Sequence, residues 1–143
     1  MDKEDIKEKI YGLLEKANSL KYIDSQRTIE FSYDALHLCE KIGYTLGEKV
    51  ATSYMAYAFN NIGNYEKALQ LVYDSLHYFI EEGFCDLMWW GYNLLGIIFY
   101  ELGNIEKSMD YLHSAQTIAV EIDFGKRYDN DATSNRSINA YFK

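Results

Sequence analysis

The sequence predicts an all-α fold, a solenoid of antiparallel helix pairs, and three observations carry this prediction. Proline, the commonest helix breaker, is absent from all 143 residues. Apolar residues recur at three- and four-residue spacing, which is typical of amphipathic helices buried along one stripe. The third observation is an internal repeat of forty residues. A period of that length indicates stacked structural units, each burying the apolar face of its neighbour.

The repeat becomes visible when residues 33–72 are laid over residues 73–112. We therefore expect one domain over residues 1–143, with repeats at about 4–43, 44–83 and 84–123. The identical pairs are Tyr33/Tyr73, Asp34/Asp74, Leu36/Leu76, His37/His77, Gly43/Gly83, Phe59/Phe99, Gly63/Gly103, Asn64/Asn104, Glu66/Glu106 and Lys67/Lys107.

Each repeat is expected to hold two helices. The first helix of the second repeat is predicted at about residues 46–61, and Thr45 with Glu48 three residues later forms a capping box for its start. Gly63 can end this helix, since glycine adopts the left-handed conformation without steric cost. Asn64 can then accept hydrogen bonds from the first free amides of the next helix. The second helices are predicted at about residues 65–82 and 105–122.

Residues 92–108 resemble a tetratricopeptide repeat. They carry an aromatic residue, then Leu95 and Gly96, an aromatic residue three positions later at Phe99, a glycine at the turn and the small Ser108 in the second helix. Residues 61–69 match the same turn. The resemblance implies a right-handed α-solenoid of about three repeats. The family's proline is missing and the period is forty instead of about 34, a variant similar to repeats of bacterial regulators.

Residues 14–30 also resemble the first, degenerate repeat of the sensory regions that precede diguanylate cyclase (GGDEF) domains, although the chain itself contains no GGDEF signature. This resemblance implies a non-catalytic module that binds a protein, a peptide or the protein's own output domain. Such a module would be the N-terminal regulatory or sensory region of a bacterial signalling protein. The alternative is an oligomerisation or scaffold element, acting as a homodimer or as a free-standing adaptor.

The end of the sequence predicts one more helix at about residues 130–143. Residues 135–143 match the start of a first helix, with Ile138, Asn139 and Phe142 in the positions of Leu95, Gly96 and Phe99. No second helix follows it. Either this helix caps the array or the chain is a fragment of a longer protein, and the fragment is the interpretation we prefer.

The first helices of such a solenoid line its concave face, and that face is the expected ligand groove. Asn60 and Asn93 are the strongest candidates, because an amide at an exposed helix position contributes neither packing nor helix propensity. Tyr57, Ile97 and Trp90 have an alternative role in packing between neighbouring first helices. Trp89 is expected in the core, with Trp90 facing the groove. The groove residues are Ser53, Tyr57, Asn60, Trp90, Asn93, Ile97, Tyr100 and Arg136.

Charge and composition argue against other functions. A net charge of −8 with no basic run disfavours nucleic acid and anionic membrane surfaces as partners. Two cysteines without a CxxC motif predict neither a disulfide framework nor a zinc site, and with no apolar leader they favour the cytoplasm. His37 and His77 are expected to pack between helices. With no P-loop, dinucleotide glycine pattern or nucleophile elbow, we expect no enzyme activity, no cofactor and no metal.

Overall fold

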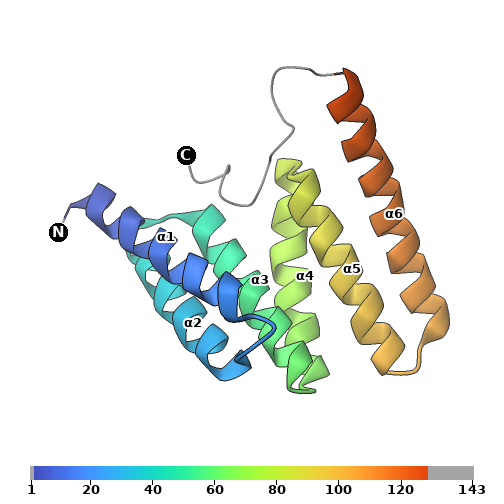
Figure 1. Cartoon of the computed structure of the whole chain (residues 1–143), viewed down its shortest axis with the longest axis horizontal. Coiled ribbons are helices and arrows are strands. Elements are labelled where there is room, and N and C mark those ends of the chain that lie inside the picture. The colour runs from blue at the N-terminus through green and yellow to red at the C-terminus, as the bar shows by residue number, and fades with distance from the viewer. Residues whose placement is uncertain (1, 129–143) are drawn as a thin grey trace. The chain divides into compact units, whose positions relative to one another are not determined.

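A computed structural model of the chain describes residues 2–128, and it is all-α in that part. Within each of the two compact units of the chain, helices that follow one another pack as antiparallel neighbours, consistent with a helical repeat (Figure 1). The predicted terminal helix at about 130–143 and Arg136 lie outside the described residues. The helices are α1 (Lys3–Leu20), α2 (Ser25–Ile42), α3 (Thr45–Asn61), α4 (Tyr65–Glu82), α5 (Cys85–Glu101) and α6 (Ile105–Tyr128).

Left-handed glycines end four successive helices, and this repeated turn confirms the prediction at Gly63. The φ angle of Gly63 is 83°, a conformation that favours glycine because a Cβ atom would be strained there. Asn64 then accepts a hydrogen bond of 3.3 Å from the amide of Lys67, as predicted for a cap. The equivalent glycines, with φ in parentheses, are Gly43 (67°), Gly83 (73°) and Gly103 (81°).

Two predicted helix ends were wrong. The capping box at the start of α3 does not form, because Tyr44 and not Thr45 is the N-cap residue and no side chain caps the helix. The preceding turn explains this: the amide of Tyr44 bonds the carbonyl of Cys39 at 2.9 Å, and the Tyr44 carbonyl already accepts from the amide of Glu48. Helix α6 also continues to Tyr128, beyond the predicted end at residue 122, whereas α4 has the predicted bounds.

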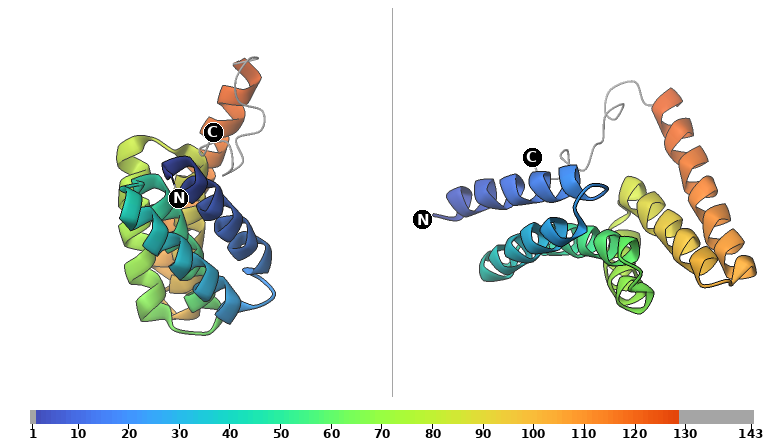
Figure 2. Two further views of the ribbon diagram at one scale, coloured as in Figure 1. Left: turned by 90° about the vertical axis from the view of Figure 1, so that its left-hand side faces the viewer. Right: turned by 60° about the horizontal axis from the view of Figure 1, so that its bottom comes forward.

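The described chain forms two compact units that divide within α4, between Ser75 and Leu76. In the first unit α2 contacts both α1 and α3, and α1 also touches α3 (Figure 2). Its core is built where these helices meet, from fully buried Ile10, Ala17, Ala35, Cys39 and Val50. Burial of these apolar side chains is the main force holding the unit together.

In the second unit α5 and α6 form an antiparallel pair around fully buried Leu95 and Ile98 (Figure 1). The two helices approach closely at Gly96, where an added Cβ would lie 2.6 Å from the side chain of Leu112. Ser108 of α6 donates a hydrogen bond of 2.7 Å to the Gly96 carbonyl at the same crossing. The small residues that suggested a repeat therefore mark a real close approach of paired helices.

Candidate functional site

Aromatic, amide and lysine side chains gather where the α1–α2 loop meets the C-terminal end of α3. Tyr57 of α3 donates a hydrogen bond of 2.9 Å to the hydroxyl of Tyr22 in the loop. Their rings meet edge to face, with centroids 5.2 Å apart and planes at 86°. Asn61 fastens the same loop by donating a hydrogen bond of 2.8 Å to the Lys21 carbonyl. We call Lys21, Tyr22, Tyr57, Asn60 and Asn61 the Tyr57 site.

The Tyr57 site combines a protonated phenol with a positive charge. The Lys21 ammonium lies 5.3 Å from the ring centroid of Tyr22 and 5.7 Å from that of Tyr57, within cation–π range of both. Burial, and then the hydrogen bond with Tyr22, raise the pKa of the Tyr57 hydroxyl well above its ordinary value. Tyr22 itself is 72% exposed. The site therefore offers an accessible aromatic face beside a cation, in a chain whose net charge is strongly negative.

Asn60 lies one turn beyond Tyr57 on α3 and has an unsatisfied polar atom. Its Oδ1 is buried and accepts no hydrogen bond from any described residue, although the side chain as a whole is partly exposed. A buried acceptor left unpaired costs about 1–3 kcal/mol. Because the amide is planar, a half-turn about its last side-chain bond exchanges the positions of oxygen and nitrogen. In its described position the oxygen is closed to solvent, so a donor from outside the chain can reach it only after this half-turn.

Ser53, a third predicted groove residue on α3, is not accessible. It is only 2% exposed, and its hydroxyl donates to the carbonyl of Val50, one turn earlier. The middle of α3 is buried around its whole circumference, since every residue from 50 to 56 is buried. Ser53 is therefore closed to a ligand in this structure, whereas Tyr57 and Asn60, near the C-terminal end of α3, are partly exposed.

The predicted groove residues of α5 belong to the second unit and share one face of that helix. Ile97 and Tyr100 are 42% and 63% exposed, whereas Trp90 and Asn93 are partly buried. The amide nitrogen of Asn93 donates to the Trp89 carbonyl at 3.1 Å, within its own helix.

The expectation that Trp89 is a core residue was wrong. Its side chain is 44% exposed and lines a shallow pocket of 270 Å³ with residues of α6. The helix next to the Trp89 side chain is thus α6, which follows α5 in the chain and supplies the other residues that line the pocket. The remaining lining residues are Ala119, Ile122 and Asp123.

The histidines do not pack between helices, and that expectation was also wrong. His37 and His77 are both exposed, and His77 lies 3.0 Å from Glu81 one turn later on the same helix. The apolar stripe of each helix falls on the opposite side, so these positions face solvent. Among the residues that the structure describes, no group of three or more His, Cys, Asp or Glu side chains could hold a metal ion.

Tyr57 was predicted from the sequence as a groove residue, but the loop residues that the fold brings to it were not predicted. Tyr22 lies 35 residues from Tyr57, and Lys21 lies 40 residues from Asn61. The second separation equals the repeat length, so the contact joins equivalent ends of successive first helices. No local pattern around Lys21 or Tyr22 signals this contact.

Comparison with known proteins does not assign the chain to a family. No protein-family model matches it. No curated protein and no solved structure match it either. Within residues 2–128, none of the helices is both long and apolar enough to span a bilayer.

Proposed function

We propose that this chain is a non-catalytic module that binds an extended peptide segment at the Tyr57 site. The observation that carries the proposal is the buried, unsatisfied oxygen of Asn60. Peptide backbone supplies N–H donors at regular intervals, and one of them would bond this oxygen once the Asn60 amide has turned outward. The resemblance to tetratricopeptide repeats, whose first helices bind peptides, supports the same conclusion.

The chemistry around Asn60 specifies the peptide further. The exposed ring of Tyr22 suits an apolar or aromatic side chain, because stiff aromatic surfaces bury area with little loss of side-chain entropy. The Lys21 ammonium suits a carboxylate. The preferred ligand is therefore an extended segment with an acidic residue next to an apolar one. It would come from a partner protein or from an output domain of the same protein, as in a regulatory region of a bacterial signalling protein.

A selection experiment tests the proposal. A random peptide library would be selected against the immobilised chain, and the enriched peptides would be measured against the Asn60→Leu variant. Loss of the acceptor should weaken binding about tenfold, equivalent to about 1.4 kcal/mol. Gln70→Leu is the matched control, because it removes an exposed amide from α4. Enriched peptides that bind Asn60→Leu as tightly as the parent chain would contradict the proposal.

Oligomerisation is the second candidate function, and exposed apolar residues on α6 favour it. Ile105, Met109 and Val120 are 49%, 65% and 63% exposed. Exposed apolar side chains of this size are typical of interfaces between subunits where they gather on one helix. Light scattering separates the two functions: a stable dimer that dissociates when Met109 is changed to Lys would favour a scaffold, and a monomer that still selects peptides would favour the binding module.

A further inference from the structure

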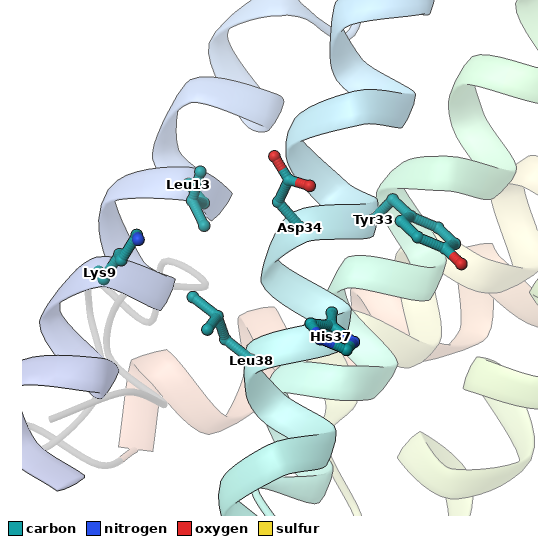
Figure 3. A pocket seen from close by; sticks show the side chains of 6 residues that line it. All are labelled: Lys9, Leu13, Tyr33, Asp34, His37 and Leu38. Carbon is teal, nitrogen blue, oxygen red and sulfur yellow. The ribbon is translucent and has the colours of Figure 1, made fainter. Parts of the chain in front are cut away.

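A second hollow lies between α1 and α2, and its lining differs in chemistry from the Tyr57 site. It has a volume of 430 Å³ and carries both charges: Lys9 on α1 and Asp34 on α2 (Figure 3). Leu13 and Leu38 line the space between the two helices. Tyr33 and His37 complete the lining from α2. None of these residues belongs to the Tyr57 site.

The forty-residue repeat gives this hollow an internal comparison. Lys49 and Asp74 occupy the positions of Lys9 and Asp34 in the next repeat. There the two side chains meet directly, with the ammonium of Lys49 bonded at 3.1 Å to both carboxylate oxygens of Asp74. Lys9 and Asp34, both within the described residues, form no such ion pair and stand apart across the pocket (Figure 3). The lysine and the aspartate therefore form an ion pair in the second repeat, whereas the equivalent side chains of the first repeat do not.

Lys9 and Asp34, which do not pair with each other, can each bind a group of opposite charge on a ligand. A carboxylate matches the ammonium of Lys9, and an ammonium matches the carboxylate of Asp34. Leu13 and Leu38 offer apolar surface in the same pocket, where the next repeat has Ser53 and Tyr78 at the same positions. A volume of 430 Å³ is near the lower end for ligand pockets and suits a small molecule.

We propose that the pocket between α1 and α2 binds a free α-amino acid with an aliphatic side chain. Its carboxylate pairs with Lys9, its ammonium pairs with Asp34, and its side chain lies on Leu13 and Leu38. This site goes beyond the proposed peptide-binding function, because the chain would also bind a small molecule, and would do so through a separate set of residues.

Titration of the ¹⁵N-labelled chain with L-leucine, followed by backbone amide shifts, tests the proposal. The expected result is saturable shifts at residues of the pocket lining. Two analogues examine the charges separately: 4-methylpentanoate lacks the ammonium and leucinamide lacks the carboxylate. Each should bind at least fivefold more weakly than L-leucine.

Variants examine the protein's side of the same contacts. Asp34→Asn and Lys9→Met should each weaken L-leucine binding at least fivefold, because each removes one charge. The register-matched controls Asp74→Asn and Lys49→Met should leave the affinity unchanged. All four side chains are on the surface or partly exposed, so the variants are expected to fold, and the amide spectrum itself verifies this.

Three results would overturn the proposal. They are the absence of saturable shifts up to the solubility limit of L-leucine, equal affinity for 4-methylpentanoate, and equal weakening by the Asp74 and Asp34 variants. None of these results affects the Tyr57 site, since its test uses peptides and Asn60.

Discussion

The hydroxyl of Ser108 donates a hydrogen bond of 2.7 Å to the carbonyl of Gly96, across the contact between α6 and α5. The carbonyl also accepts within its own helix, so Ser108 uses its second lone pair. The bond forms only because Gly96 has no side chain: an added Cβ would lie 2.6 Å from Leu112 and 3.3 Å from the Ser108 carbonyl. A glycine and a serine thus set the separation of the two helices.

Gly96→Leu should lower the free energy of unfolding by about 1–3 kcal/mol, because the new side chain overpacks this contact. Urea denaturation followed by circular dichroism measures the change. Gly12→Ala is the matched control, since Gly12 also lies inside a helix but an added Cβ meets nothing within 4 Å. That control should raise stability by about 0.5–1 kcal/mol through helix propensity. A Gly96→Leu variant as stable as the parent would contradict the close approach.

Two buried serines should respond oppositely to alanine. Ser108→Ala should destabilise the chain by about 1 kcal/mol, because it removes the bond to Gly96. Ser32→Ala should be neutral or stabilising, since its buried hydroxyl has no hydrogen-bond partner among the described residues. Parallel urea titrations of both variants provide the comparison. Equal losses would show that Ser32 also has a partner in the folded chain.

Stability should fall at alkaline pH through Cys39. Burial, with smaller contributions from Glu48 and Glu40, raises the pKa of this thiol to about 12. An unfolded thiol ionises near about pH 8.5. Between that pH and about 12, the unfolded chain therefore releases a proton that the folded chain keeps. The free energy of unfolding therefore decreases as pH rises through this window.

The Cys39→Ala variant isolates this contribution. Between about pH 8 and pH 10, the parent should lose about 2 kcal/mol more stability than the variant, as measured by urea denaturation at each pH. The raised pKa of Tyr54, also caused by burial, acts in both proteins and cancels in the difference. If the free energy of unfolding fell equally with pH in both proteins, that result would contradict a buried, protonated thiol at Cys39.

Tyr57→Phe should loosen the α1–α2 loop. The change removes the hydrogen bond to Tyr22 but keeps the ring, so the loss of stability should be about 0.5–1.5 kcal/mol. Hydrogen exchange at the amides of Ile23 and Asp24, which bond the Leu20 carbonyl, should accelerate in the variant. Tyr33→Phe is the control, since Tyr33 is 64% exposed and lies outside the Tyr57 site. Unchanged exchange in Tyr57→Phe would show that the loop does not depend on this bond.

The helices and the turns between them follow from the amino-acid sequence alone. Apolar spacing located α4 at its observed bounds, and Gly63 with Asn64 specified the turn before it. These features are decided within a few residues, because φ preferences and caps act on the adjacent backbone. The repeat pattern also singled out the small residues Gly96 and Ser108, and these two residues lie where α5 and α6 approach closely.

Which side chains are accessible, and what they meet, depends on the tertiary packing of the helices. Ser53 occupies a groove position by register, yet neighbouring helices bury it, while Trp89 and His37 are exposed. Tyr57 meets Tyr22 across 35 residues. Helical periodicity predicts the face of a helix on which a residue lies, but not how many neighbours cover that face. Burial and long-range contacts arise from the packing of whole helices. They therefore cannot be predicted from the few residues around Tyr22 or Ser53.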